Sequence, residues 1–191
     1  MTSIVINLPQ RVDRYKEFVE EVKWIQLEPK IMDGIPHREP YKGIGEAHVN
    51  CIQYAKAHSH PFIIIMEDDV VFQGKQHTYP YFIECMENSP DDWDVLLGGV
   101  YNRGATVDYN NWWEQVSTFC GLHFYIVASK AFDKLITWDG TQHFDRWMAK
   151  QNLNIFVTKK YIAHQRDGYS DNAKGYTQFN DEHLDKHRLL L

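Results

Sequence analysis

Apolar and polar residues follow one another in blocks along this chain, and the lengths of the blocks indicate strands and helices. Continuous apolar runs at 4–8 and 62–66 are typical of strands buried on both faces of a sheet. Residues 11–26 and 45–58 instead space their apolar side chains at the helical period, with polar and charged residues between them. A short strand at 30–32 completes this alternation of strand and helix. The alternation predicts an α/β fold with parallel strands.

The remainder of the chain continues with strands and helices in a less regular order. Its expected strands are residues 93–100, 119–128 and 155–158, and its expected helices are residues 130–137, 142–150 and 181–190. Residues 102–111 follow neither period, so we expect a mobile loop there. Residues 165–177 form a polar, glycine-containing segment.

Composition places the chain among globular proteins with one domain. Its 191 residues are 43% hydrophobic and 24% charged, which suffices for one full-sized core. The formal net charge is −6, so the chain has no general basic field to hold nucleic acid or an anionic membrane. We therefore expect one domain over residues 1–191, with no nucleic-acid partner.

Cysteine usage and the first residues indicate the compartment. Cys51, Cys85 and Cys120 are odd in number and widely spaced, which favours free thiols in a reducing compartment. The N-terminal residues lack the basic stretch and long apolar run of a secretion signal, and no apolar stretch approaches the ~18 residues of a membrane span. We expect a cytoplasmic protein.

The most unusual local feature is a cluster of three acids, Glu67-Asp68-Asp69, directly after the apolar run at 62–66. Two like charges about 4 Å apart repel by roughly 4 kcal/mol at an effective dielectric of about 20, so the cluster favours a bound cation. If the strand continues, Glu67 and Asp69 share one side and Asp68 points to the other. Carboxylate oxygens suit hard cations, which predicts Mn²⁺ or Mg²⁺. A solvated acidic turn is the alternative.

Two motifs in these segments resemble those of a known family. Ile6-Asn7-Leu8-Pro9-Gln10-Arg11-Val12-Asp13-Arg14 resembles the N-terminal I-N-L-x-x-R-x-x-R signature of glycosyltransferase family 25, the lipooligosaccharide and procollagen galactosyltransferases. Met66-Glu67-Asp68-Asp69-Val70 resembles the L-E-D-D-V motif of the same family. Weaker similarities extend the resemblance over about residues 4–172, with Val49-Asn50 standing where members commonly carry a Ser-His pair.

The resemblance implies a fold and an activity. The implied fold is GT-A, a Rossmann-like fold of nucleotide-diphospho-sugar transferases with a mixed central sheet. Residues 1–100 would form its nucleotide-binding half and residues 101–191 its acceptor-binding half. The implied activity is metal-dependent transfer of a hexose, with inversion, from a nucleotide-diphosphate sugar such as a UDP-sugar to a hydroxyl of a glycan or glycoprotein. The loop at 102–111 would then close over the acceptor.

The resemblance also assigns residues to the nucleotide. It places four of them beside it: Asn7, Leu8, Arg11 and Arg14. An arginine is apt there because its planar fork can clamp a phosphate or stack on a base, although both arginines could equally pair with Asp13 and Glu17 on a solvated helix face. Asp33 follows the second strand and can accept hydrogen bonds from a base or ribose, or it can form the turn before Gly34.

In GT-A enzymes the last acid of such a triplet usually holds the metal, and the earlier ones face the ribose. The resemblance therefore makes Asp69 the metal ligand and places Glu67 and Asp68 on the nucleoside. A histidine late in the chain often completes the metal site, and His164 is the candidate because it follows the strand-like residues 161–163. With 10 histidines in the chain, the alternative for His164 is a surface or hydrogen-bonded core residue.

A transfer with inversion needs a carboxylate that removes the proton of the acceptor hydroxyl. Asp145 is the candidate, because it lies near the start of a predicted helix between Phe144 and Trp147, in a partly apolar setting. The alternative is that Asp145 only complements the helix dipole at that N-terminus.

Three other functions fit part of the sequence. A receiver-like signalling domain has a similar acid-tipped strand, but there the strand begins the domain, whereas 66 residues precede the triplet here. A metal-dependent phosphoesterase or nuclease would need more convergent His and Asp ligands. A catalytically inactive module that binds sugar nucleotides would use the same donor residues.

Overall fold

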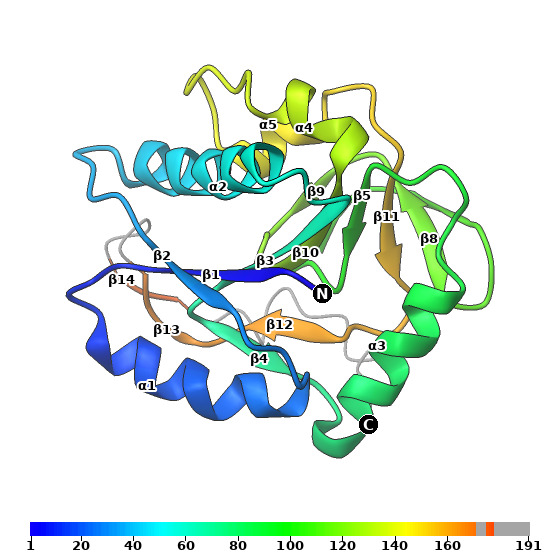
Figure 1. The fold of residues 1–191 in the computed structure, drawn as a ribbon, viewed down its shortest axis with the longest axis horizontal. Coiled ribbons are helices and arrows are strands. Elements are labelled where there is room, and N and C mark those ends of the chain that lie inside the picture. The colour runs from blue at the N-terminus through cyan, green and yellow to red at the C-terminus, as the bar shows by residue number, and fades with distance from the viewer. Residues whose placement is uncertain (171–174, 178–191) are drawn as a thin grey trace.

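A computed structural model of the chain describes residues 1–170 and 175–177, and Figure 1 shows a central sheet between two groups of helices. The strands of this eight-stranded sheet are, in spatial order, β2 (Lys30–Asp33), β1 (Ser3–Asn7), β3 (Phe62–Glu67), β10 (Phe124–Ala128), β5 (Val95–Leu97), β11 (Ile155–Thr158), β8 (Trp113–Val116) and β7 (Thr106–Asp108). Strands that are distant in the sequence are therefore neighbours in one sheet.

Strand β1 lies between two parallel partners, and this pairing fixes the edge of the sheet where a ligand can bind. Asn7 pairs with Asp33 of β2, and Ile6 pairs with Glu67 of β3. The three strands thus end at the same level. In open α/β sheets the carboxyl ends of parallel strands are the usual place for a ligand.

Strand β10 runs antiparallel to both of its neighbours in the middle of the sheet. Phe124 pairs with Met66 of β3, and β5 pairs with the other edge of β10. Beyond β5, β11 is parallel to it, and β8 and β7 continue the sheet as antiparallel strands. Because β10 is reversed, the chain enters it where β3 ends, and the Glu67 N–H donates to the His123 carbonyl at 3.1 Å.

Helices cover both faces of the sheet (Figure 1). On one face lie α2 (Pro40–Ala57), α4 (Ser129–Leu135) and α5 (Phe144–Met148), and on the other lie α1 (Val12–Glu21) and α3 (Thr78–Glu87), with short 3-10 turns at Val22–Trp24 and Lys75–His77. Side chains alternate along β3, so Ile63 and Ile65 are buried in one core and Ile64 and Met66 in the other. Burial on both faces explains the unbroken apolar run of this strand.

Three two-stranded sheets complete the described fold. They are β4 (Val70–Phe72) with β12 (Ala163–Gln165), β13 (Gly168–Ser170) with β14 (Gly175–Thr177), and β6 (Asn102–Arg103) with β9 (Phe119–Cys120). In the first of these, Gln165 pairs with Val70, the residue that follows the acid triplet. The late segment 163–165 is thereby brought beside the end of β3.

The predicted α/β fold is confirmed, and its sheet is mixed. The segment 102–111, expected as a mobile loop, instead contains β6 and β7. The physical reason is a tight turn at Asn110, whose Oδ1 accepts hydrogen bonds from the N–H groups of Trp112 and Trp113, each at 2.9 Å, and which closes the β7–β8 hairpin. The helix expected at 181–190 lies outside the described residues.

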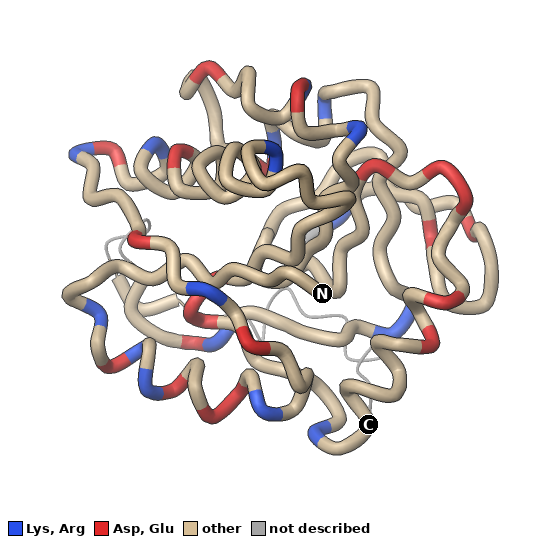
Figure 2. Tube along the Cα trace, viewed as in Figure 1, with Lys and Arg blue, Asp and Glu red and all other residues tan. Residues whose placement is uncertain are grey.

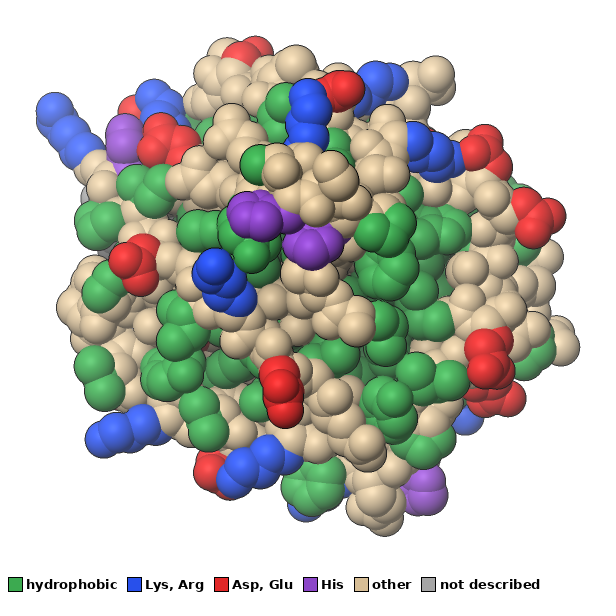
Figure 3. Space-filling view, in the orientation of Figure 1, with side chains coloured by type: hydrophobic (Ala, Val, Ile, Leu, Met, Phe, Trp, Pro, Cys, Tyr) green, Lys and Arg blue, Asp and Glu red, His purple; other side chains and the backbone are tan. Residues whose placement is uncertain are grey.

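The surface and the thiols agree with the composition. Charges of both signs are interspersed along α1 (Figure 2), and Lys and Arg side chains stand apart on the face in Figure 3. The cysteines are free thiols, and burial raises the pKa of both Cys51 and Cys85 to about 12. Over the described ranges, each helix is either too short or too polar to cross a bilayer.

Candidate active site

A cavity of about 600 Å³ opens at the carboxyl ends of β1, β2 and β3. The loops that follow β1 and β2 and the N-terminal part of α2 contribute to its lining, as does the acid triplet. Further lining residues come from the segment before β10, the start of α5 and the β13–β14 hairpin. The cavity therefore gathers residues from both halves of the sequence at one edge of the sheet.

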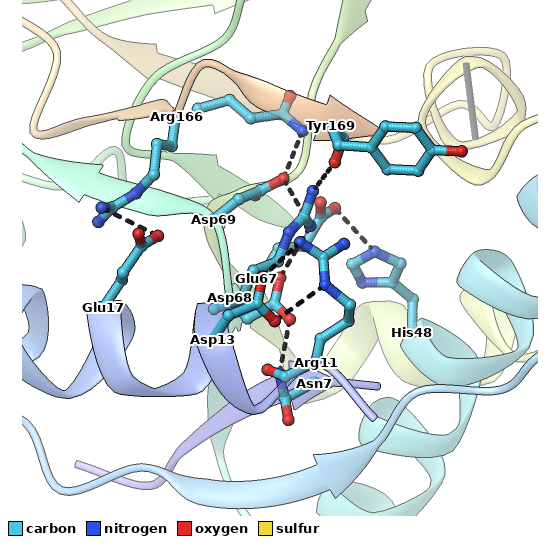
Figure 4. A network of polar contacts seen from close by, with 12 residues as sticks. Asn7, Arg11, Asp13, Glu17, His48, Glu67, Asp68, Asp69, Arg166 and Tyr169 are labelled. Atoms are coloured by element: carbon cyan, nitrogen blue, oxygen red, sulfur yellow. Dashed lines mark hydrogen bonds and ion pairs between the residues drawn. The ribbon is translucent and has the colours of Figure 1, made fainter. Parts of the chain in front are cut away.

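The acid triplet forms a turn and does not continue the strand. Strand β3 ends at Glu67 and β4 begins at Val70, so Asp68 and Asp69 occupy the turn between them. The expected alternation of side chains stops at Glu67, and both aspartates face the same guanidinium. Arg14 Nη1 lies 3.1 Å from Asp68 Oδ1 and 3.3 Å from Asp69 Oδ2. Figure 4 shows the three carboxylates with their polar partners.

Asp68 is buried and is held by residues of the N-terminal motif. Asn7 Nδ2 donates to Asp68 Oδ2 at 2.6 Å and to the Arg11 carbonyl at 3.2 Å. Burial raises the pKa of Asp68, although Arg14 and Asn7 both favour its charged form. Asn7 lies outside the cavity lining, so in this structure it orients an acid that lines the cavity.

Asp69 has surroundings that disfavour a negative charge. Its Oδ2 accepts hydrogen bonds from Arg14 and from Gln165 Nε2, the latter at 2.9 Å. Its Oδ1 is buried and has no hydrogen-bond partner among the described residues. Burial and the neighbouring Glu67 raise the pKa of Asp69 to about 7. An unpartnered carboxylate oxygen on a residue that lines a cavity fits a hard divalent cation.

The donor set of the site limits how such a cation would be held. Across residues 1–170 and 175–177, no three side chains of the His, Cys, Asp and Glu types converge to hold a metal by themselves. Magnesium sites that act on diphosphates commonly use one or two carboxylates, with water and phosphate oxygens as the other ligands. The acid triplet could supply the carboxylate ligands of such a site.

Glu67 belongs to a buried chain of hydrogen bonds that joins α2 to β10. His48 lies 3.2 Å from Glu67 Oε1 through its Nε2 and 2.8 Å from the Tyr125 hydroxyl through its Nδ1. A neutral His48 that donates to the carboxylate accepts from the tyrosine hydroxyl. Desolvation raises the pKa of Glu67, but the hydrogen bond from His48 lowers it, and the pKa stays below its usual value. The His48 ring also stacks on Phe144 of α5, with ring centroids 5.6 Å apart.

Asp145 lines the cavity from the start of α5. Its Oδ2 accepts a hydrogen bond from the Gly121 N–H at 3.0 Å, and its Oδ1 accepts one from the Arg146 N–H at 2.7 Å. Gly121 has a φ of 102°, and a Cβ there would lie 2.8 Å from the Tyr101 ring, so this position requires glycine. His143, two residues before Asp145, stacks its ring on Tyr41 of α2 with centroids 4.9 Å apart. These contacts fix Asp145 against α2 and the entry to β10.

The structure brings most of the predicted site residues together. Those that line the cavity are Leu8, Arg14, Glu67, Asp68, Asp69 and Asp145. Arg11 and Asp33 lie just outside the lining, each next to a chain neighbour that belongs to it. The Arg11 guanidinium pairs with Asp13 at 3.0 Å, and Asp33 is exposed at the end of β2.

His164 is not brought to Asp69 in this structure. Adjacent residues of a strand point to opposite sides, and in β12 the side chain that reaches Asp69 is that of Gln165. The Nδ1 of His164 instead lies against the side-chain amide of Gln73. Burial lowers the pKa of His164 to about 4.

The lining also includes polar residues that the motifs did not assign to the site, among them His48, Tyr101, His143 and Gln165. His48 lies on the apolar side of the second helical pattern, so the sequence indicated a buried histidine. A buried polar group needs a hydrogen-bond partner, which was the available signal for its role. The signals for Gln165 were its place among the weaker family similarities and the strand period, which puts its side chain opposite that of His164. His143 is brought in by long-range packing without a local signal, and Tyr101 had only its aromatic side chain in loop-like surroundings, which suits a sugar site.

The strand order, the reversed β10 and the cavity at the carboxyl edge are those of a GT-A-like fold. The crystal structure of A197 from STIV is similar, with a TM-score of 0.53, 14% sequence identity, and coverage of 96% of this chain and 97% of A197. A glycosyltransferase involved in the glycosylation of the major capsid of PBCV-1 has a TM-score of 0.52 and 14% identity, over 82% of this chain and 80% of that protein. At these identities the similarity shows the fold alone. No family model matches the chain, and no curated protein sequence does.

Proposed function

We propose that this protein is a metal-dependent glycosyltransferase, which moves a hexose from a nucleotide-diphosphate sugar to a hydroxyl of a glycan or a protein-linked glycan. The observation that carries the proposal is the composition of one cavity. The acid triplet and Arg14 line it beside the parallel strands, and Asp145 lines it from α5. A site for a charged donor and a candidate base thus share about 600 Å³, which matches the space that a small-molecule ligand needs.

The donor would lie across the carboxyl ends of β1, β2 and β3. Leu8 and the segment 34–37 offer an apolar and backbone surface for a base, and Glu67 and Asp68 offer acceptors for ribose hydroxyls. Arg14 offers a guanidinium for the diphosphate. Arg11 and Asp33 remain proposed nucleotide contacts at the rim, and Asn7 supports the site by holding Asp68. A UDP-sugar is the donor that the motif resemblance favours.

Asp69 is the proposed ligand for Mn²⁺ or Mg²⁺, because its Oδ1 is buried without a partner among the described residues. Such an ion, when bound, would neutralise negative charge on the departing diphosphate. His164 remains a proposed second ligand, but it can reach Asp69 only if its ring leaves the amide of Gln73. The protein's own contribution is to keep the carboxylate in a buried, fixed position, through the hydrogen bond from Gln165.

The proposed chemistry is a single displacement. The oxygen of an acceptor hydroxyl attacks the anomeric carbon of the sugar, the bond from that carbon to the diphosphate oxygen breaks, and the hydroxyl proton moves to Asp145. The configuration at the anomeric carbon inverts. The N–H groups of Gly121 and Arg146 hold the Asp145 carboxylate in one orientation for this step. Residues 1–100 would then serve the donor and residues 101–191 the acceptor.

Two rival functions are weakened by the structure. A receiver domain has an all-parallel doubly wound sheet, whereas β10 here is antiparallel to both of its neighbours. A phosphoesterase with two metals needs a cluster of ligands, and the described residues hold no group of three. A sugar-nucleotide-binding module without activity shares the cavity and is separated from the enzyme by experiment.

The test combines binding with turnover. Calorimetry with UDP and with several UDP-sugars, each with and without Mn²⁺, should show binding that depends on the ion. Release of UDP from UDP-sugars in the presence of glycan acceptors should then show transfer. Binding without any release of UDP would indicate the inactive module, and no binding of any nucleotide sugar would contradict the donor site.

A further inference from the structure

Arg14 makes two contacts with the acid triplet and a third with the β13–β14 hairpin. Its Nη1 lies 3.1 Å from Asp68 Oδ1 and 3.3 Å from Asp69 Oδ2, and its Nη2 donates to the Tyr169 carbonyl at 2.6 Å. Among the described residues, the ion pairs that the triplet makes with lysine or arginine all go to Arg14. One guanidinium therefore pairs with two of the three acids.

The environment makes this guanidinium a strong competitor for any second cation. The Arg14 side chain is 19% exposed, and the side chains of Asp68 and Asp69 are 9% and 8% exposed, so water screens the charges weakly. A divalent ion that binds Asp69 brings like charge next to Nη1. Nη1 holds Asp69 Oδ2 and the ion would bind Oδ1 of the same carboxylate, so the two cations would repel each other strongly in this weakly screened site.

The third contact of Arg14 reaches a different element. Tyr169 lies in β13, which pairs with β14, and Ser170 and Thr177 of this hairpin line the cavity. Figure 4 shows the Tyr169 carbonyl directed at the guanidinium. A movement of Arg14 away from the aspartates therefore also removes a hydrogen bond that ties β13 to the donor side of the cavity.

We propose that Arg14 is a resident counter-cation: its guanidinium neutralises the acid triplet until a divalent cation displaces it from Asp69, and this displacement also releases the β13–β14 hairpin. The inference rests on the proposed function, in which Asp69 binds that cation. Filling of the acidic site and loosening of one wall of the cavity are thus one event. The freed guanidinium is then available to a diphosphate.

The decisive experiment is a titration with MnCl₂ alone, without nucleotide, followed by calorimetry. Arg14→Gln removes the competing charge, so we expect it to bind Mn²⁺ about tenfold or more tightly than the wild type. Arg14→Lys keeps the charge but loses the planar fork, so its affinity should lie between those of the wild type and Arg14→Gln. Arg166→Gln is the matched control, since that guanidinium pairs with Glu17 and Glu21 of α1, and its affinity should not change.

Hydrogen exchange at the amides of residues 168–170 provides the second readout. In the wild type, Mn²⁺ should speed exchange there, whereas in Arg14→Gln exchange should be fast from the start and insensitive to Mn²⁺. An Arg14→Gln protein that binds Mn²⁺ equally or more weakly overturns the inference, as does wild-type exchange that ignores Mn²⁺. If Arg14→Gln does not fold, the exchange of the wild type with and without Mn²⁺ still decides the matter.

These measurements contain no sugar nucleotide, so they separate the two ideas. If Mn²⁺ displaces Arg14 but the protein binds no UDP-sugar, the counter-cation inference holds and the proposed transferase function is wrong. If the protein turns over UDP-sugar but Arg14→Gln leaves the affinity for Mn²⁺ unchanged, the proposed transferase function holds and the counter-cation inference is wrong.

Discussion

At the scale of single residues, Asp69 links stability to pH. Its pKa is raised from 3.8 to about 7, so between these values the folded protein binds a proton that the unfolded chain has released. The contribution of Asp69 to stability therefore falls as pH rises from about 4 to 7, and it is most unfavourable above pH 7. Asp69→Asn should raise the melting temperature of the metal-free protein at pH 8 by about 2 °C or more, with little difference at pH 4.

Scanning calorimetry at the two pH values checks this expectation. Asp133→Asn is the control, because Asp133 is exposed on α4 and pairs with Lys56 far from the cavity. Asp69→Asn should also lose the stabilisation by Mn²⁺ that the wild type gains. A variant that is less stable than the wild type at pH 8 would show that the carboxylate is favourable where it stands.

Asp145 supports a second prediction at this scale. Asp145→Asn keeps the size of the side chain and an oxygen that can accept from Gly121, but it removes the basic carboxylate. We expect unchanged binding of UDP-sugar with a transfer rate reduced about 10²-fold or more. Steady-state assays and calorimetry on Asp139→Asn, an exposed position in the preceding loop, give the comparison. Near-normal turnover would assign the base to another carboxylate of the cavity, with Glu67 the first to test.

The same scale shows what the sequence could reveal about the site. Glu67, Asp68 and Asp69 were visible because three acids after a buried strand are electrostatically costly. His48 was missed because its role depends on Tyr125, 77 positions later in the sequence. Local sequence patterns reveal clusters of charge and the spacing of apolar residues. The hydrogen bond between His48 and Tyr125 forms only when α2 packs against β10.

At the scale of elements, the position of α2 depends on a residue without a side chain. A Cβ on Gly45 would lie 2.2 Å from the Trp138 ring, and that ring packs edge-on against Phe144 of α5. Gly45→Ala gains about 1 kcal/mol of helix propensity, but overpacking costs about 1–3 kcal/mol, so we expect a lower melting temperature. Because Phe144 precedes Asp145, turnover should fall as well.

Two further variants make this prediction specific. Adding Trp138→Phe to Gly45→Ala should recover part of the lost stability, since the atoms nearest the new methyl belong to the outer ring of the indole. Gly168→Ala is the control, because a Cβ at Gly168 meets nothing within 4 Å. Thermal melts of the four proteins are sufficient. Equal melting temperatures for Gly45→Ala and the wild type would show that Trp138 yields without cost.

Elements also differ in how well the sequence predicts them. Strands β1 and β3 were predictable because they are short apolar runs, and β2 because it is a short segment between two helical patterns. The β7–β8 hairpin was not, because its strands are short and its turn at Asn110 depends on side-chain hydrogen bonds. Helix α3 was also missed, since an aromatic-rich segment with Pro80 does not carry a clear helical period.

At the scale of the whole molecule, a ligand in the cavity should stabilise the entire fold. The cavity is lined by residues on both sides of β10, so a bound nucleotide contacts segments that unfold together. At a free ligand concentration about 100 times the Kd, the stabilisation is about 2.7 kcal/mol, or roughly 5–10 °C for a chain of this size. Thermal melts with UDP and Mn²⁺ together measure it, with uridine and Mn²⁺ as the control. No shift with UDP at any concentration would contradict a diphosphate site here.

The sheet also predicts that residues 1–100 do not fold alone, although they supply much of the proposed donor site. Strand β5 lies between β10 and β11, and β3 pairs with β10, so the fragment loses a partner of β3 and both partners of β5. We expect its circular dichroism to show no cooperative thermal transition, in contrast to the full chain. A sharp transition in the fragment would show that the two proposed halves are independent units.

The reversed strand β10 has a consequence for how the protein is made. Strand β3 leaves the ribosome long before its partner β10, and at about 5–20 residues per second the wait lasts several seconds. During that time one edge of a strongly apolar strand is open to pairing with another nascent copy. The yield of folded protein should therefore depend on the speed of translation between residues 67 and 124 as well as on the stability of the finished fold.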